Sequence, residues 1–463
     1  MTLVLILMLE NRDPEYQPSA CPPPSPPQTK DLLQARKNLL LPSVTHYYRE
    51  PLQIVRAQGL YVWDDTGRRY LDAFGGVVTV SVGHNHPKIN ERLKRYIDSE
   101  APQHTTTLYL TQPVTDLAAR LTHLAPAELK RAFFTNSGSE ANEMAILLAR
   151  QYTKRFEVVA LKHAYHGGTS GTLSLVGQHT WKWGGPGLSG ISHAAQPDCY
   201  RCPFGAKPSS CGFECADDVE KTIQTTTSGE IAAFIAEPIQ GVAGFVTPPA
   251  EYFARVHAIV KRYGGLYISD EVQTGVGRTG KYWFGILHSG VVPDLLTMAK
   301  GLGNGAPIAG GLVREEIAQS LQGKIQFSTF AGNPWSSLQA DETLRILEED
   351  ECILEKADTL GNRLIEGLRA RLENNPIVGD IRGRGLMVGI ELVQDRKSKA
   401  HGIEEMKDAM EETRARGILI GKGGLFGNVI RIAPPMCIQE SEIDTLITLV
   451  SEALDAVASK RSR

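Results

Sequence analysis

Two apolar runs of the sequence end in side chains that can do chemistry. Residues 266–268 are apolar and lead into two nearby carboxylates, Asp270 and Glu271, and residues 294–300 (DLLTMAK) end in Lys300. The open, glycine-rich loop GLGNGAP follows the lysine and leaves room for a ligand. An amine in such a place can form a Schiff base with an aldehyde. A solvated lysine and a capping or salt-bridging aspartate are the alternatives that each residue alone leaves open.

Two further stretches supply groups that a phosphorylated aromatic aldehyde would need. In FFTNSGSEANEMA (133–145) a strand, a turn of small residues and a helix start are expected, so the N–H groups of Gly138 and Ser139 can bind phosphate oxygens. In AYHGG (164–168), Tyr165 can stack on a flat heterocycle. An ordinary helix cap and a packing role for Tyr165 are the alternatives. With a lysine and an aspartate for the ring nitrogen, these groups match what proteins supply to pyridoxal phosphate (PLP).

The elements that must position these groups alternate along the chain. Between about residues 111 and 345, short runs that are apolar on both faces alternate with amphipathic stretches. The pattern predicts an α/β fold, with a mainly parallel sheet covered by helices on both faces and ligands bound beyond the carboxyl ends of the strands. We expect strands at 131–135, 158–162, 231–238, 265–271, 294–300 and 308–313, and helices at 111–126, 139–153 and 251–264.

The chain divides into four predicted parts. Residues 1–35 are a proline-rich tail that we expect to be disordered. Residues 36–90, with β-like alternation and a D-x-x-G turn at 64–67, are expected to pack with the C-terminal domain. Residues 91–345 form the large domain, and residues 346–463 a smaller α+β domain. The smaller domain should contain a charged helical region (345–374), a hairpin (378–393), a helix (404–416) and a strand within 429–435.

In this order the motifs resemble those of the class III pyridoxal-phosphate aminotransferases of fold type I, over roughly residues 40–460. The matching stretches are NSGSEANE, AYHG, AEPIQG, DEVQTGVGRTG, PDLLTMAKGLGNGAPIA, STFAGNP and GRGLMVGIEL. Within the class, GVVTVSVGHNHPKIN, AEPIQGVAG and IRIAPPMCI are most similar to the mitochondrial second-type alanine–glyoxylate aminotransferases. The proline-rich tail and the cysteine-rich segment 199–215 depart from that pattern.

The resemblance implies a role for each matching residue. It makes Lys300 the Schiff-base lysine and Asp270 the partner of the pyridine nitrogen, and it places Arg431 at the substrate carboxylate. The other implied cofactor contacts are Gly138 and Ser139 (phosphate), Tyr165 and Val272 (ring faces), His166 and Glu237 (support), Gln273 (3-hydroxyl) and Thr329 (phosphate of a neighbouring subunit). The last of these implies a homodimer or a dimer of dimers.

The activity implied is a ping-pong transfer of an amino group from a small amino acid (alanine or a β-amino acid) to a small 2-oxo acid (glyoxylate or pyruvate). Val242 supports small substrates, because ornithine-type relatives have a glutamate there that pairs with the arginine matching Arg431. The alternatives are a transaminase for 4-aminobutyrate or another omega-amino acid, a PLP-dependent lyase, and a non-catalytic descendant. The last is disfavoured because Lys300 and Asp270 are both present.

Composition limits the partners and the location. The net charge of −3 over 463 residues gives no reason to expect a nucleic-acid surface, and no apolar run approaches the roughly 20 residues of a membrane helix. The tail contains Glu10, Asp13 and Glu15, unlike a mitochondrial transit peptide, so the cytoplasm is the predicted location.

Seven cysteines in so long a chain do not make a disulfide scaffold. Cys199, Cys202, Cys211 and Cys215 nevertheless form two close pairs in a Pro/Gly-rich segment. Reduced thiols, a zinc site and disulfides all remain open for them. No metal is expected in the active site.

Overall fold

The computed structural model describes residues 28–43, 46–185, 187–349 and 352–461. They fall into two compact units. The smaller unit consists of two segments, one that extends to Arg56 and a second that comprises Trp63–Arg68. It contains α2 (Thr29–Leu39) and the predicted turn, in which Asp64 Oδ1 accepts hydrogen bonds from the amides of Thr66 and Arg68, both at 3.0 Å. Most of the predicted tail lies outside the described residues. Strands β1 (Ile54–Gln58) and β2 (Tyr61–Asp64) have residues in both units.

The larger unit is built on a seven-stranded sheet with the order β4-β10-β9-β8-β7-β5-β6. The strands are β4 (Arg131–Thr135), β5 (Glu157–Leu161), β6 (Ile191–Ala194), β7 (Ile231–Ala236), β8 (Leu266–Asp270), β9 (Leu295–Met298) and β10 (Ala309–Val313). Strands β6, β5, β7, β8 and β9 are parallel, and β10 is antiparallel to both β9 and β4. The predicted mainly parallel α/β fold is therefore confirmed.

Each face of this sheet is buried under helices, which explains why its strands are apolar on both sides. On β8, Tyr267 packs in a cluster with α8 (Glu214–Thr226) and α9 (Tyr252–Arg262). Its neighbours Leu266 and Ile268 face the other way, toward α6 (Gly138–Thr153), α7 (Ser170–Leu175) and α10 (Glu315–Gln319). Because successive side chains of a strand point to opposite faces, a strand covered on both faces must be apolar throughout.

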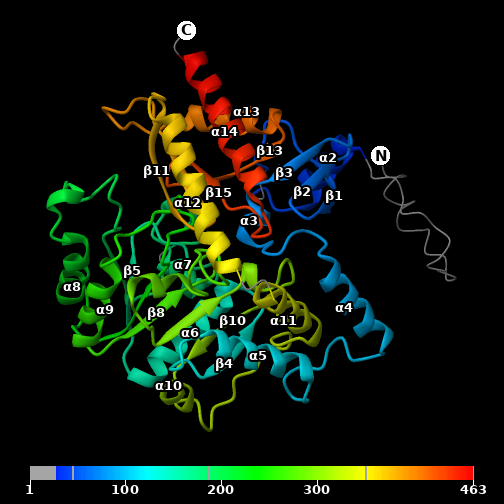
Figure 1. Ribbon diagram of the computed structural model, residues 1–463. Helices are drawn as coiled ribbons and strands as arrows, with labels where there is room; N and C mark the ends of the chain where they lie inside the picture. The colour runs from blue at the N-terminus through cyan, green and yellow to red at the C-terminus, as the bar shows by residue number, and fades with distance from the viewer. Residues whose placement is uncertain (1–27, 44–45, 186, 350–351, 462–463) are drawn as a thin grey trace. The chain divides into compact units, whose positions relative to one another are not determined.

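A second, four-stranded sheet has the order β11-β12-β15-β14 and is antiparallel. The predicted hairpin is β11 (Val378–Arg384) with β12 (Met387–Leu392), and the predicted strand is β15 (Val429–Ile432), beside β14 (Gly421–Gly423). Helices α12 (Ile353–Leu372) and α14 (Glu440–Arg461) run side by side there, and α13 (Ile403–Ala415) packs on α14 (Figure 1). Strand β13 (Ile418–Leu419) pairs in parallel with β3 (Arg69–Asp72). The predicted domain boundaries stay predictions.

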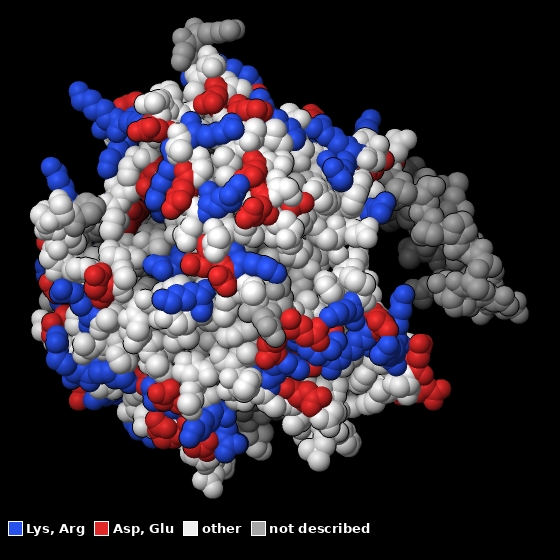
Figure 2. Space-filling model, in the orientation of Figure 1, with Lys and Arg blue, Asp and Glu red and all other residues white. Residues whose placement is uncertain are grey.

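The remaining helices of the larger unit are α3 (Gly75–Val78), α4 (Pro87–Asp98), α5 (Gln112–Leu124) and α11 (Pro334–Glu349). Helix α11 packs against both α4 and α5. On the face shown in Figure 2, positive and negative side chains of the described residues are interspersed. Within the described part of the chain, no helix combines the length and the apolar character that crossing a bilayer requires.

Candidate active site

The carboxyl ends of β7, β8 and β9 surround a pocket of about 150 Å³ that contains most of the predicted site residues. We call it the cofactor pocket. Its walls are Gly138, Ser139, Asn142, Tyr165, His166, Gly167, Glu237, Asp270, Val272, Gln273, Ala299 and Lys300. Residues from five separate stretches of sequence therefore meet where an α/β sheet is expected to bind its ligand. Thr329 and Arg431 are not among the described residues that line it.

The Asp270 carboxylate is held in one orientation. Its Oδ2 accepts hydrogen bonds from Asn142 Nδ2 and His166 Nδ1, both at 2.7 Å, and its Oδ1 accepts from the Val272 amide at 3.0 Å. Asn142 Oδ1 in turn accepts from Thr297 Oγ1 at 2.6 Å. The sequence interpretation missed Asn142 and Thr297. A buried asparagine on the otherwise apolar inner side of α6 is the signal that could have revealed the first of them.

The two carboxylates at the end of β8 have different surroundings. Asp270 lines the cofactor pocket, whereas Glu271 accepts hydrogen bonds from the amides of Gly285 and Ile286, both at 2.8 Å, and from Thr274 Oγ1 at 2.5 Å. Burial raises the pKa of Glu271, against these hydrogen bonds. Of the pair, only Asp270 lies where it can contact a ligand.

Lys300 follows β9 in a strained backbone conformation. Its φ is +37°, close to the left-handed region that side-chain-bearing residues rarely adopt. Burial lowers the pKa of its amine to about 8, and Arg431 acts in the same direction, against Asp270 and Glu237. A substantial fraction of the amine is therefore neutral near pH 7 to 8. Only the neutral amine is nucleophilic, so the pocket favours attack on an aldehyde.

Glu237 closes the pocket at the end of β7. Its Oε1 accepts from the Tyr165 amide at 3.0 Å and its Oε2 from the Gly241 amide at 2.8 Å. The pKa of Glu237 is raised to about 7, mainly by burial. Asp270 adds to this increase, and His166 opposes it. Glu237 thus fixes the backbone that carries Tyr165 and titrates near neutral pH.

The residues present fit PLP. Gly138 and Ser139 are the first two residues of α6, so their N–H groups have no acceptor within the helix. Ser137 and Glu140 form a capping box there, so Ser137 caps the helix while the first two amides stay available. A Cβ at Gly138 would lie 3.0 Å from both methyl carbons of Val272, closing the gap that a ring would enter.

Two buried polar atoms on the pocket walls support the same conclusion. His166 Nε2 and Gln273 Oε1 have no hydrogen-bond partner among the described residues. Buried polar atoms rarely stay unpaired, so a polar ligand is expected between them.

Arg431, the predicted substrate-carboxylate residue, is buried on β15. Its Nε donates to Lys422 O at 3.1 Å and its Nη1 to Gly241 O at 3.2 Å, and its guanidinium lies 4.7 Å from the centre of the Phe74 ring. Gly241 directly precedes Val242, so Arg431 reaches the turn that carries Val242. Its positive charge also contributes to the lowered pKa of the Lys300 amine.

Thr329 lies outside this pocket, exposed in the loop before α11. The chain by itself therefore does not bring Thr329 to its own cofactor pocket. The role that the resemblance gives to Thr329 requires a second copy of the chain.

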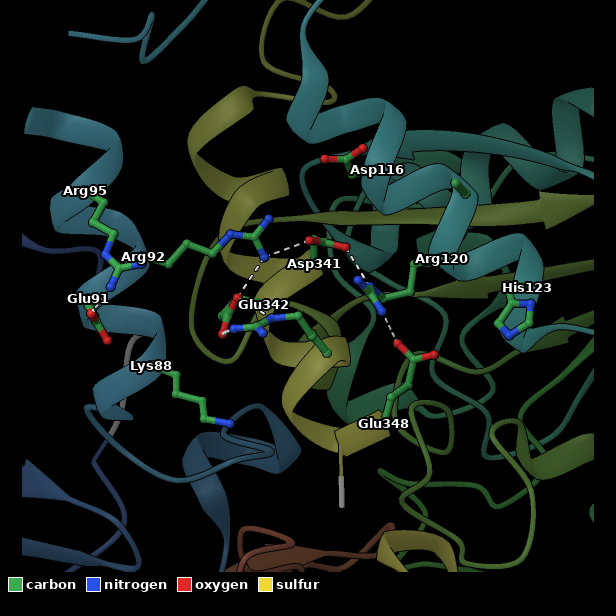
Figure 3. A pocket seen from close by; sticks show the side chains of 12 residues that line it. Lys88, Glu91, Arg92, Arg95, Asp116, Arg120, His123, Asp341, Glu342 and Glu348 are labelled. Atoms are coloured by element: carbon green, nitrogen blue, oxygen red, sulfur yellow. Dashed lines mark hydrogen bonds and ion pairs between the residues drawn. The ribbon is translucent and has the colours of Figure 1, made fainter. Parts of the chain in front are cut away.

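A larger cavity lies elsewhere and is lined by charged groups. It is a groove of about 780 Å³ between α4, α5 and α11. In Figure 3, Asp341 of α11 lies between Arg92 of α4 and Arg120 of α5, and Glu342 lies beside Arg92. Most charged side chains of the groove are paired in this way, so the cofactor pocket is the better candidate for the active site.

The structure gives no support to zinc at the cysteine-rich segment. Cys199, Cys202, Cys211 and Cys215 are free cysteines. Among the described residues, no group of three His, Cys, Asp or Glu side chains is arranged to hold a metal ion.

Comparison with known proteins agrees with this geometry. The family described as "Aminotransferase class-III" matches residues 44–454. "Alanine--glyoxylate aminotransferase 2 homolog 2, mitochondrial" of Arabidopsis thaliana is 43% identical over 95% of this chain and 89% of its own length. "Leucine/methionine racemase" of Thermococcus litoralis is 36% identical over 93% and 97%.

A solved structure, a thermostable (S)-enantioselective omega-transaminase from Thermomicrobium roseum, has a TM-score of 0.86 and 35% identity over 93% of this chain and 99% of that one. The match to the family covers almost the whole of the described chain. The protein is therefore a pyridoxal-phosphate-dependent enzyme that belongs to the class III aminotransferase family.

Proposed function

We propose that this enzyme moves an amino group from a small amino acid, alanine or a β-amino acid, to a small 2-oxo acid, glyoxylate or pyruvate, by a ping-pong mechanism. The observation that carries the proposal is the placement of Lys300, with a pKa of about 8, and of the fixed Asp270 carboxylate on the same pocket. In a ping-pong order the donor leaves as its oxo acid before the acceptor enters.

PLP, when bound, supplies an electron sink for the carbanion at the substrate carbon. Asp270 would hold the proton on the pyridine nitrogen, and Asn142 and His166 fix its carboxylate for that task. Lys300 would hold the aldehyde, and its amine is placed to act as a general base toward the substrate carbon. The amides of Gly138 and Ser139 would bind the phosphate.

The remaining site residues orient the cofactor. Tyr165 and Val272 would pack on the two faces of the ring, and Gln273 would lie near the 3-hydroxyl. A Cβ at Gly241 would lie 2.2 Å from Gln273 Nε2, so a glycine is needed for Gln273 to occupy this place. Glu237 keeps Tyr165 in position through its backbone amide.

Substrate size is the finer part of the proposal, and it rests on Val242. Arg431 binds the substrate carboxylate through its planar fork. Val242 is uncharged and cannot pair with Arg431, so the guanidinium serves both half-reactions. This favours substrates whose carboxylate lies close to the reacting carbon. The name of the Arabidopsis relative points to the same substrates.

A homodimer, or a dimer of dimers, is the proposed assembly. Leu108, Tyr109 and Leu110 are at least 70% exposed, and so is Ile325 at 97%. The two segments are connected through His104, whose ring lies 5.1 Å from that of Phe330 and whose Nδ1 is 3.1 Å from Asn333 Nδ2. So many exposed apolar side chains around Thr329 suit a surface covered by a second copy.

Four alternatives give different products. An omega-transaminase would prefer 4-aminobutyrate or ornithine, a lyase would release ammonia without an acceptor, and a non-catalytic descendant would do neither. The Thermococcus relative adds a racemase, which would interconvert the enantiomers of one amino acid. A cytoplasmic location stays a prediction, since residues 1–27 are outside the described part and the Arabidopsis relative is named as mitochondrial.

A donor panel tests the activity. The purified holoenzyme is given alanine, β-alanine, 3-aminoisobutyrate, 4-aminobutyrate and ornithine in turn, with glyoxylate or pyruvate, and products are separated by chiral chromatography. We expect alanine or a β-amino acid to be the best donor, with parallel lines in the double-reciprocal plot. Preference for ornithine would contradict the argument from Val242. Enantiomer interconversion without an acceptor, or ammonia release, would identify a racemase or a lyase.

Covalent attachment tests the site itself. Borohydride treatment of the holoenzyme should fix the cofactor on the peptide that contains Lys300. Attachment to a different lysine would contradict the assignment, whatever the substrate proves to be.

A further inference from the structure

A second cavity of about 260 Å³ lies at the same edge of the sheet as the cofactor pocket. Lys162 and His163 follow β5 and line one side of it. The opposite side comes from Glu391 of β12, His401, and the turn that contains Phe426. Carboxyl ends of parallel strands are where α/β proteins bind ligands, and this cavity is built at the ends of β5 and β6.

The second cavity is separate from the cofactor pocket, because the two have no lining residue in common. Gln240, fully buried, stands beside it. Its Nε2 donates to Lys162 O at 3.0 Å and its Oε1 accepts from Gln196 Nε2 at 2.8 Å.

Three of the four carboxylate oxygens of Asp198 and Glu391, which line the second cavity, have hydrogen-bond partners. Asp198 Oδ1 accepts from the amides of Tyr200 and Arg201, at 2.9 and 3.0 Å. Glu391 accepts from Arg201 Nε through one oxygen and from Arg382 Nη1, at 2.7 Å, through the other. Both oxygens of Glu391 and one oxygen of Asp198 are therefore occupied.

The donor groups, by contrast, are unused. The side chains of Lys162, His163 and His401 make no hydrogen bond or ion pair with any described residue, and His401 Nδ1 is buried. Burial lowers the pKa of both imidazoles, so each offers a neutral ring N–H near pH 7, beside the charge of Lys162. Three unused donors, one of them the charged amine of Lys162, favour an anion as the ligand.

The rest of the wall is apolar and suits a short carbon chain. The His401 and Phe426 rings contact each other at a tilt of 32° with centroids 4.1 Å apart, and Phe426 is 45% exposed. Pro203, Ala243 and Leu425 extend this surface. We propose that the second cavity binds a small carboxylate with a short apolar body: Lys162 and the two imidazoles hold the carboxylate, and the apolar wall holds the carbon chain.

A ligand here would be in contact with the substrate side of the enzyme. Ala243 lines the second cavity, and the carbonyl of its neighbour Val242 accepts from the Gly424 amide at 2.9 Å. Arg431 bonds Gly241 on the same turn. A carboxylate bound in the second cavity would therefore stabilise the conformation of the turn that carries Val242. The site itself does not depend on the proposed substrates.

Site-resolved labelling of lysines tests the proposal on the holoenzyme. Lys162 is exposed, so an N-hydroxysuccinimide acetate reagent should acetylate it, and peptide mass spectrometry gives the rate. We expect 3-methylbutanoate, which cannot accept an amino group, to slow labelling of Lys162 at least about fivefold when saturating. Lys221, exposed on α8, should be labelled at an unchanged rate, and sodium chloride at equal ionic strength should protect neither.

Variants separate this site from the active site. Protection of Lys162 should persist in Arg431→Ala, and it should be lost in His401→Leu, whose fold is checked by thermal unfolding. In calorimetric titration with 3-methylbutanoate, Lys162→Ala should bind about tenfold more weakly, as expected for loss of a charge-assisted contact. Lys162→Ala should keep the basal activity.

The remaining outcomes decide the source of the ligand or overturn the proposal. Protection by 3-methyl-2-oxobutanoate as well as 3-methylbutanoate indicates general carboxylate recognition, and protection by the oxo acid alone assigns the site to the enzyme's own substrate class. Equal labelling of Lys162 with either acid and with chloride would overturn the proposal. Loss of protection in Arg431→Ala would also overturn it as a separate site, whether or not the donor panel supports the proposed activity.

Discussion

The charged groove and the cofactor pocket both contain buried carboxylates, but their partners differ. In the groove, Asp341 is 2% exposed and binds Arg92 at 2.7 Å and Arg120 at 2.6 Å. In the cofactor pocket, Asp270, also 2% exposed, is held by an amide, a backbone N–H and an imidazole, and faces an amine with a lowered pKa. The first arrangement neutralises charge, whereas the second keeps a charge oriented toward a ligand.

The backbones of the two regions differ as well. The groove is made of three regular helices, and none of its lining residues has a positive φ. Among the residues that line the cofactor pocket, Lys300 has a φ of 37°. Strained residues of this kind collect at ligand sites, where the surrounding structure holds them. Size therefore says less about function than unpaired polar atoms and strain do.

The largest predicted effect is on catalysis. Asp270→Asn keeps the shape of the side chain but removes the charge that would hold the pyridine nitrogen protonated. We expect kcat/KM for the best donor to fall by about 10³-fold, the size of a lost acid–base contribution. The loss should be much smaller in Glu271→Gln, corrected for folded protein, because Glu271 bonds the amides of Gly285 and Ile286 instead. Equal losses would remove the distinction between the two carboxylates.

Substitutions in the groove should lower the stability of the protein and leave its catalytic rate unchanged. Asp341→Ala removes the carboxylate between Arg92 and Arg120, although each arginine keeps a second partner, Glu342 or Glu348. We expect a loss of about 2–3 kcal/mol in the free energy of unfolding, somewhat below that of a fully orphaned buried charge. Denaturant titration measures it, and kcat of the folded enzyme should be unchanged.

A rim substitution serves as the control for the groove. Glu91 forms an exposed ion pair with Arg95 on α4, and Glu91→Ala should cause no measurable change. A large drop in kcat for Asp341→Ala would show that the groove takes part in the reaction.

Particular elements and residues show how much of the structure could be predicted from the sequence. Strands β7 and β8 were predictable because burial on both faces demands continuous apolar runs, whereas β6, with the sequence ISHA, has too little apolar pattern to be recognised. The positions of Lys300 and Asp270 followed from strand ends. Arg431 and Thr329 were identified only through the family resemblance, because contacts between distant segments, or between chains, leave no local pattern. The unused donors of Lys162 and His401 needed the structure.

A smaller effect should appear in the pH dependence of cofactor capture. The apoprotein attacks the aldehyde through neutral Lys300, and its pKa of about 8 means that deprotonation occurs as pH rises through 8. We expect the rate of covalent attachment to rise about tenfold between pH 7 and 9 and then to level off. Nα-acetyl-lysine, with an ordinary pKa near 10.4, should still be accelerating at pH 9 and provides the control. A profile like that of the free amine would show that the pocket does not lower the pKa of Lys300.

The smallest effect concerns the strained turn at α3. Val77 and Val78 both have φ near +65°, which is costly for β-branched residues and acceptable for glycine. Val77 is 39% exposed, so Val77→Gly removes about 1–2 kcal/mol of strain and loses little packing. The greater freedom of glycine in the unfolded chain offsets roughly 0.5–1 kcal/mol of that gain. We expect Val77→Gly to stabilise the protein by about 0.5 kcal/mol in denaturant titration.

Val78→Gly is the matched control, because it relieves the same kind of strain at a buried position. Val78 is 2% exposed and packs with Phe74, Phe245 and Met387. Losing a buried valine costs about 1.5–3 kcal/mol, more than the strain returns, so Val78→Gly should destabilise the protein. Opposite signs for the two adjacent valines would show that the strain at Val77 is real and is held in place by its buried neighbour. Destabilisation by both would mean that the Val77 side chain contributes packing that outweighs its backbone strain.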